Sequence, residues 1–159
     1  MTALIRKQLE RADELHARSM ELADQALTLG FQGQQPESRR RLEEAFKLER
    51  DAADLLRDAD IPELSRAVYH RSAASLAIQV RDWDEATRLI EQGLSGSAPH
   101  SIAAELKELR QVVAAQRPDA SLVEHSVPML PSYEVERVTI YARAFVADTS
   151  DSYLQPRPA

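Results

Sequence analysis

The sequence predicts an all-α domain of about five helices over residues 1–117, followed by an extended C-terminal arm over residues 118–159 with one β-strand. Apolar side chains recur at steps of three and four residues through the first three quarters of the chain, which is the period of amphipathic helices. Residues that cap or open helices precede several of these stretches. Five of the eight prolines lie at or beyond residue 118, so the helical part is expected to end there.

Length and composition restrict the class of protein. With 159 residues, 43% of them hydrophobic and 29% charged, the chain can bury a core. The absence of cysteine excludes a disulfide framework, a thiolate nucleophile and a cysteine-based zinc site. A formal net charge of -6 disfavours non-specific binding of nucleic acid, which depends on Lys and Arg. No stretch approaches the roughly 20 apolar residues of a membrane span, and we therefore expect a cytoplasmic protein without a nucleic-acid or membrane partner.

The first two helices are predicted on either side of a turn. Gly30, Gly33 and Pro36 interrupt the helical period between them. Before the turn, a helix over about residues 3–30 carries one stripe of apolar or small side chains: Leu9, Ala12, Leu15, Ser19, Leu22, Ala26 and Leu29. After it, a helix that ends near residue 58 is expected to bury Leu42, Ala45, Phe46, Leu48, Ala52, Leu55 and Leu56.

Two acidic residues are predicted to cap the third and fourth helices. Asp60 precedes Pro62 and Glu63, and proline suits a first helical turn because its missing N–H has no helical partner there. Asp82 stands three residues before Glu85 in the same kind of capping pattern. The third helix is therefore expected to end near residue 81.

The fourth and fifth helices are predicted to be separated by Gly96 and Pro99. Glycine commonly ends a helix and proline commonly opens one. The fourth helix is expected to bury Trp83, Ala86, Leu89, Ile90 and Leu94. The fifth is expected to end before Pro118 and to present a one-sided stripe made of Ile102, Leu106, Leu109 and Val113.

The segment from about residue 67 to residue 99 resembles a helical hairpin of the tetratricopeptide repeat (TPR) family. The family motif has a small residue midway down the first helix, an acidic and aromatic turn, two small residues seven apart in the second helix, and a closing proline. These features are present here as Ala74, the turn Asp82-Trp83-Asp84-Glu85, Ala86, Gly93 and Pro99. Small residues allow two antiparallel helices to approach closely, while the aromatic ring fills the space at the turn.

A weaker copy of the motif precedes this hairpin, with residues 42–45 at the turn and Ala52 as the later small residue. Ala45 and Ala86 are 41 residues apart, compared with about 34 in a standard repeat. With the fifth helix as a cap, the resemblance covers about residues 3–116 and implies a short TPR-like solenoid. The alternative is an unrelated helical bundle, in which the same alanines reflect helix propensity.

The resemblance also implies a function, because TPR domains usually hold another protein. The positions that correspond to the family's groove are Val68, Arg71, Ser75, Ile78 and Gln79. In family members that clamp a peptide carboxylate, an asparagine lies one turn from the cation, and Arg71 has no such neighbour here. The resemblance therefore implies a protein or peptide partner without a carboxylate clamp.

The C-terminal arm carries one pattern typical of a half-buried strand. Apolar and polar or aromatic residues alternate from Glu136 to Val146, and their dense β-branching favours a strand over about residues 134–147. A helix with Val135, Val138, Ala142 and Phe145 on one side is the alternative. A lone strand needs a partner for its N–H and C=O groups; residues 121–129, a second copy of the chain and another protein are the candidates. Tyr141 and Phe145 are the predicted contacts with a partner.

No residue pattern predicts catalysis, a cofactor or a metal. The histidines occupy separate segments, and none of them forms the i, i+4 pair of a helical metal site: His16, His70, His100 and His125. The carboxylates at residues 82–85 are explained by a helix start. We therefore expect a non-enzymatic scaffold or adaptor that uses its helical groove and its arm. The alternatives are a structural subunit that self-assembles into a homo-oligomer through the arm, and a helical sensor that holds a small ligand.

Overall fold

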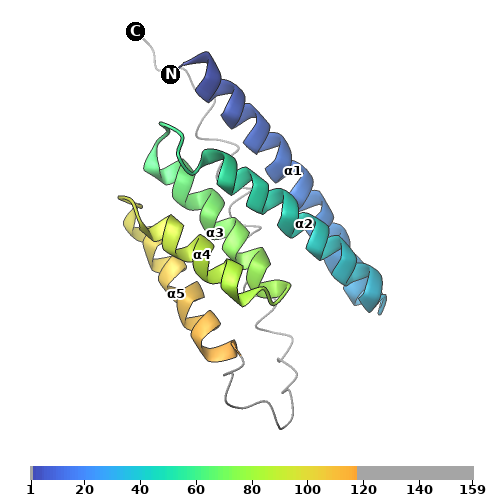
Figure 1. The fold of residues 1–159 in the computed structure, drawn as a ribbon. Coiled ribbons are helices and arrows are strands. Elements are labelled where there is room, and N and C mark those ends of the chain that lie inside the picture. The colour runs from blue at the N-terminus through green and yellow to red at the C-terminus, as the bar shows by residue number, and fades with distance from the viewer. Residues whose placement is uncertain (1, 118–159) are drawn as a thin grey trace. The chain divides into compact units, whose positions relative to one another are not determined.

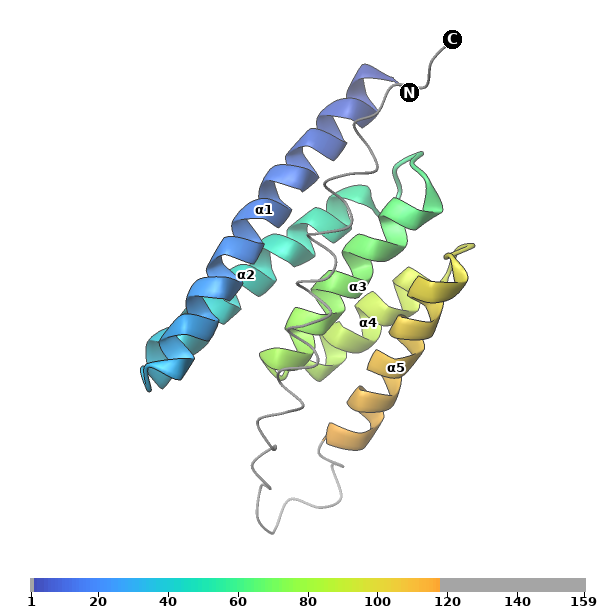
Figure 2. The same cartoon turned by 180° about the vertical axis from the view of Figure 1, so that it is seen from behind.

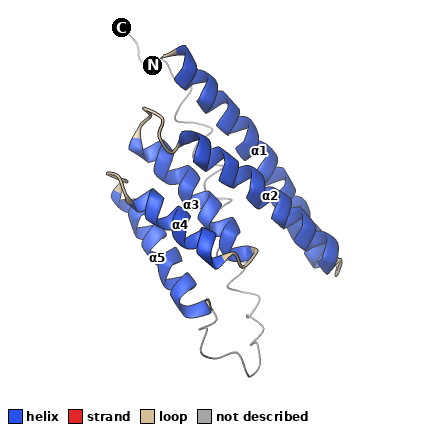
Figure 3. Cartoon of the chain, in the orientation of Figure 1, coloured by secondary structure: helices blue, strands red, loops and turns tan. Residues whose placement is uncertain are grey.

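Five helices follow one another through residues 2–117, the part of the chain that the computed structural model describes (Figure 1). They are α1 (Ala3–Phe31), α2 (Gln35–Leu56), α3 (Glu63–Gln79), α4 (Trp83–Leu94) and α5 (His100–Gln116). Residues 2–117 contain no strand (Figure 3), so the predicted all-α class is confirmed for this part. None of these five helices combines the length and the apolar character needed to cross a bilayer. The strand predicted at residues 134–147 lies outside the described residues.

The five helices form a succession of neighbours. Each packs on the next in the chain, and α3 also packs on α5. Among the described helices, only α2 has its backbone close to the backbone of α1. From behind, α1, α3 and α5 lie nearer the viewer, with α2 and α4 beyond them (Figure 2). This is an array of two helical hairpins, α1–α2 and α3–α4, followed by a single helix.

The α1–α2 hairpin packs through small residues. Ala12, Ser19 and Ala26 are the buried residues of α1, and they recur every seven residues. Two hydroxyls cross between the helices: Ser19 Oγ donates to the Ala45 carbonyl at 2.8 Å, and Ser38 Oγ donates to the Ala26 carbonyl at 2.7 Å. Hydrogen bonds from side chain to backbone at these distances require the two helices to approach closely, which the small side chains allow. They also fix which residues of α1 and α2 lie at the same level.

Helix α3 lies at the centre of the array, because all twelve residues from 67 to 78 are buried. Four of them are alanines and two are serines, and small side chains let several neighbouring helices pack closely around one helix. Helices α2, α4 and α5 pack against α3. The fold of residues 2–117 is therefore organised around α3.

Gly93 marks the closest approach between α4 and its neighbours. A methyl group added at its Cα would lie 2.9 Å from Leu106 Cδ1 in α5 and 3.1 Å from His70 Cβ in α3. The leucine tip can move aside, but the histidine Cβ is fixed by the α3 backbone. A small residue is therefore required at position 93, as the helical-hairpin motif predicted.

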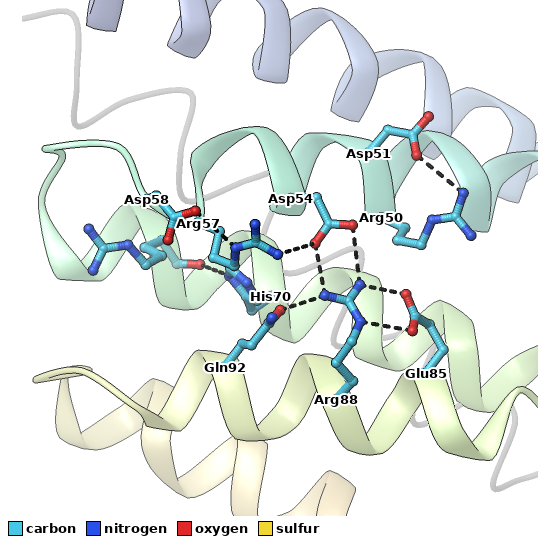
Figure 4. A network of polar contacts seen from close by, with 10 residues as sticks. Arg50, Asp51, Asp54, Arg57, Asp58, His70, Glu85, Arg88 and Gln92 are labelled. Carbon is cyan, nitrogen blue, oxygen red and sulfur yellow. Dashed lines mark hydrogen bonds and ion pairs between the residues drawn. The ribbon is translucent and has the colours of Figure 1, made fainter.

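A network of ion pairs joins α2 to α4 (Figure 4). The Arg88 guanidinium donates to both carboxylate oxygens of Asp54, at 2.8 and 3.2 Å, and to Glu85, and it also contacts the Gln92 side-chain oxygen at 2.7 Å. The hydrogen bonds to Glu85 and Asp54, with the Glu85 bond the larger cause, raise the pKa of Arg88 above its ordinary value, although burial lowers it. The Arg88 side chain is 32% exposed, so we expect this network to fix the relative position of two helices more than to add stability.

The helix ends agree with the sequence in part. Asp82 caps α4 as predicted, because its side chain accepts a hydrogen bond from the Glu85 N–H at 3.2 Å. The predicted cap at Asp60 is wrong: the N-cap of α3 is Pro62, which makes no side-chain cap bond. Pro62 and Pro99 both have the extended, non-helical backbone typical of an N-cap residue.

The sequence predicted more buried side chains than the structure has. Ala86, Leu89 and Ile90 of α4 are buried, whereas Trp83 and Leu94 are only half-buried. The same holds for all four leucines of the predicted first stripe and for three leucines of the second: Leu9, Leu15, Leu22, Leu29, Leu42, Leu48 and Leu55. The reason is that α1 and α2 lie at one end of the array, where neighbouring helices cover them less completely.

Replacing Gly93 with alanine should destabilise the domain by about 1–2 kcal/mol, because overpacking against His70 exceeds the gain in helix propensity. Urea denaturation followed by circular dichroism measures the change. Gly30→Ala is the matched control, since its added methyl group would meet only Ser38 Oγ at 3.4 Å. Equal effects of the two substitutions would contradict the close approach at Gly93.

Replacing Arg81 with glycine should stabilise the domain by about 0.5–1 kcal/mol, because Arg81 has a left-handed backbone conformation that favours glycine. Its φ is 63°, in the turn that links α3 to α4. The same denaturation experiment measures the gain. Arg57→Gly is the control, because Arg57 ends α2 with a right-handed φ of -52° and should lose stability.

Candidate functional site

The predicted groove residues lie on one side of α3, and four of the five are buried. Val68, Arg71, Ser75 and Ile78 are between 4% and 6% exposed, and Gln79 is half-buried. Their spacing of three and four residues gives them a common helix face. With so little exposed surface, the four buried side chains contribute to the packing of α3. Their role in binding a partner stays a prediction.

Arg71 joins α3 to α5 through an ion pair with Glu105. The side chain of Arg71 is 7% exposed and that of Glu105 is 28% exposed. Losing one member of a shielded pair is costly, because the other charge is then left poorly solvated. Arg71 therefore has a structural role at this face, which the sequence did not indicate.

The two polar neighbours of Arg71 on this face bond along their own helix. Ser75 Oγ donates to the Arg71 carbonyl at 3.0 Å, and Gln79 Nε2 donates to the Ser75 carbonyl at 3.5 Å. The Ser75 hydroxyl is thus satisfied within α3. Gln79, near the end of α3, is the most accessible of the five predicted groove residues.

A set of polar contacts connects α1 and α2 with α3. We call the residues Asp13, His16, Glu49 and Tyr69 the α1–α3 seam. The Tyr69 hydroxyl donates to the Asp13 carboxylate. The rings of His16 and Tyr69 meet edge to face, with centroids 5.7 Å apart and an angle of 77° between their planes. In the described part of the chain, this seam links α1 to α3 through side chains rather than through backbone packing.

His16 and Glu49 form the most enclosed pair in the seam. His16 Nδ1 lies 2.9 Å from each carboxylate oxygen of Glu49, whose side chain has no exposed surface. Burial lowers the pKa of His16, but the hydrogen bond from His16 to Glu49 and the negative charges of Glu49 and Asp13 outweigh it, while Arg71 opposes them. The net pKa is raised, so the seam favours a histidinium at Glu49.

Burial is the main cause of the pKa shifts of two other titratable side chains of α3. Burial and the neighbouring Asp13 raise the pKa of Tyr69, so its hydroxyl keeps its proton and acts as a donor. Burial lowers the pKa of His70, and its Nδ1 contacts the Arg66 carbonyl at 2.9 Å. The neutral form of His70 donates to that carbonyl, which suits a core histidine.

The other predicted contacts, Tyr141 and Phe145, lie outside the described residues. In residues 2–117, no three His, Asp or Glu side chains converge as a metal ion would require. Within these residues, the face of α3 and the seam beside it bring polar side chains of several helices together, and they are the candidate site.

The sequence did not reveal the seam, although one of the seam residues carried a signal. Glu49 lies four residues after Ala45 and three before Ala52, on the buried side of α2. A carboxylate in an apolar stripe indicates a buried partner, because an unpaired buried charge is very costly. Nothing in the sequence indicated that the partner is His16, which comes 33 residues earlier.

Comparison with known proteins gives no match: no family model matches the chain, and no curated protein or solved structure matches it significantly.

The His16–Glu49 pair should make stability depend on pH. The pKa of His16 is raised in the folded state, so its contribution is complete below the unfolded value of about 6.5. It is then lost as the pH rises through the folded pKa. Unfolding free energies measured by urea titration from about pH 5.5 to 8.5 should fall in the wild type and fall less in His16→Gln.

Glu49→Gln is the companion variant, because it keeps the histidine and removes the charge that raises its pKa. Its stability should no longer fall as the pH rises, because burial, the largest effect on His16, then lowers the pKa of its ring without the opposing charge of Glu49. Parallel pH profiles for the wild type and both variants would show that the pair does not titrate in this way.

Proposed function

We propose that this chain is a non-enzymatic, TPR-like scaffold that binds a protein or peptide through the face of α3 between α1 and α5. The observation that carries the proposal is the arrangement of the helices: α1 and α3 follow one another on the same side, yet they are joined only by side chains within residues 2–117. A partner segment that lies along this side would meet polar groups from several helices at once.

The small residues of the hairpin motif support the TPR-like part of the proposal. Ala74 and Ala86 have no exposed surface, and Gly93 has no room for a side chain. These are the positions at which the resemblance requires close approach of helices. Their burial favours a packed hairpin and is also compatible with a helical bundle that has no family relationship.

The accessible polar groups at this face suggest how a partner is held. Asp13 is exposed, and His16, Gln79 and Glu105 are half-buried, so each of these side chains keeps some surface that a partner could contact, whereas Val68 and Ile78 are buried. We propose that Gln79 and Glu105 make the first polar contacts with the partner. In the bound complex, the partner also contacts four further residues: Val68, Arg71, Ser75 and Ile78. Apolar anchors within a polar rim are typical of protein interfaces.

We propose a second contact through the C-terminal arm, with Tyr141 and Phe145 as its aromatic contacts. Aromatic side chains bury much surface at a low cost in conformational entropy, which makes them frequent hot spots. No cofactor or metal enters this proposal. The work of the protein would be to bring a partner to a defined position, and we propose that it does so in the cytoplasm.

The binding face can be tested by site-specific photo-crosslinking of the full chain. A photoreactive residue at Gln79 should capture a partner, and the same residue at Lys107, exposed on α5, should not. With the captured partner purified, Gln79→Arg should weaken binding about tenfold, which corresponds to about 1.4 kcal/mol. Isothermal titration calorimetry measures this change.

Gln79 is preferred over Arg71 for this test, because loss of the buried Arg71–Glu105 pair would also lower stability. Lys107→Glu is the matched control and should leave affinity unchanged. A partner that crosslinks equally well from positions 79 and 107, or one whose affinity Gln79→Arg does not alter, would exclude this face.

A further inference from the structure

The outer edge of the α1–α2 hairpin carries a row of leucines that faces away from α3. Ala12, Ser19 and Ala26 face α2. Each is followed three residues later by a leucine, which places Leu15, Leu22 and Leu29 about 60° to one side of that contact line. His16, whose ring contacts Tyr69 of α3, lies about 40° to the other side. The leucine row is therefore on the flank opposite α3, and all three leucines are half-buried.

Helix α2 continues the same row. Leu48 and Leu55 follow Ala45 and Ala52 by three residues and are also half-buried, whereas Phe46 and Ala53 on the other flank are buried. Because α1 and α2 are antiparallel, equal rotations of about 60° bring both leucine rows to the same edge. Leu4 of α1, 69% exposed, extends this edge toward the N-terminus.

Charges border the leucines in a repeated pattern of opposite sign. On α1, Arg11 and Arg18 stand four residues before Leu15 and Leu22. On α2, Glu44 and Asp51 stand four residues before Leu48 and Leu55. The Arg11, Glu44 and Asp51 side chains are 61%, 44% and 56% exposed. The two charges named on α1 are thus basic and the two on α2 acidic, although Arg11, Glu44 and Asp51 also pair within their own helices, with Glu14, Arg41 and Arg50.

The levels of these charges match across the hairpin. The contacts Ser19–Ala45 and Ala26–Ser38 define which residues of the two helices are level. By that register, Arg18 and Glu44 are offset by two residues along the hairpin axis. Arg11 and Asp51 are offset by the same amount. Two residues correspond to about 3 Å along a helix, which a flexible arginine side chain spans.

The opposite end of the array has no such edge. Of the half-buried residues of α5, Val112 is the one large apolar side chain, and the exposed residues of α5 are polar or small: His100, Ser101, Ala104, Lys107, Glu108, Arg110, Gln111, Ala114 and Ala115. One end of the described array is thus suited to solvent, and the other presents leucines between two charged rows. This asymmetry indicates that the α1–α2 edge is used for contact.

We propose that this edge is a two-fold interface with a second copy of the chain. A two-fold axis parallel to the hairpin places α1 of one chain against α2 of the other at the same level, so the two helices are antiparallel. Arg11 and Arg18 then oppose Asp51 and Glu44 of the second copy, twice over, and the leucine rows meet as a four-helix bundle core. The inference does not depend on the function proposed for the α3 face.

Sedimentation equilibrium of the full chain tests the interface. We expect a mass of twice the 17.8 kDa of one chain. The double variant Arg11→Glu/Arg18→Glu should raise the dimer dissociation constant by about tenfold or more, because like charges then oppose each other at four positions. Adding Glu44→Arg and Asp51→Arg should restore the dimer to within about threefold of the wild type.

Restoration by the opposite charges is the decisive outcome, since a loss of folding would not be reversed by it. Circular dichroism checks that each variant stays helical, and Lys107→Glu/Arg110→Glu on α5 is a control that should leave the dimer intact. A wild-type monomer at about 100 μM would overturn the proposal and leave the edge to a different partner. A dimer that the Arg11 and Arg18 variant does not weaken would overturn it in favour of an interface elsewhere, the C-terminal arm included.

Discussion

The structure depends on the burial of α3. Residues 67–78 are buried, and α2, α4 and α5 pack against this one helix. Such packing is sterically possible because half of those twelve residues are alanine or serine. The same constraint extends to Gly93, where α4 approaches His70 so closely that a methyl group has no room. A larger side chain at any of these positions must push a neighbouring helix away, which changes the geometry of the face that α3 shares with α1 and α5.

The polar groups inside this fold favour one arrangement of the helices over others. Glu49 has no exposed surface and pairs with His16, while Arg71 pairs with Glu105. A buried pair of this kind adds little net stability, but any arrangement that separates its members leaves a charge without a partner. The pairs join α1 to α2 and α3 to α5, and Tyr69–Asp13 adds the link between α1 and α3. We infer that these pairs fix the positions of the helices around α3.

The sequence predicted the helices well and the environment of their side chains less well. Periodicity located five helices and the capping pattern of Asp82 and Glu85 located the start of α4, since both signals depend on residues close together in the chain. The cap at Asp60 failed because Pro62 itself became the N-cap of α3. Four leucines that were expected to be buried are only half-buried: Leu15, Leu22, Leu48 and Leu55. Their exposure depends on which helices lie at the end of the array, and periodicity carries no information about that. The partners of Glu49 and Arg71 are 33 and 34 residues away in the chain, so only the fold identifies them.

One flank of α1 contacts the rest of the helical array, and the other flank faces away from it. Its flank with Asp13 and His16 is held by α2 and α3 through polar side chains, whereas its flank with Leu15 and Leu22 faces away from both contacts. A second chain on the leucine flank would leave the α3 flank free, so self-association and partner binding are geometrically compatible. It would also bury leucines that one end of the array leaves half-exposed. If both proposals hold, a dimer would present two α3 faces, and a partner with two binding segments would gain affinity through the higher effective concentration of the second segment.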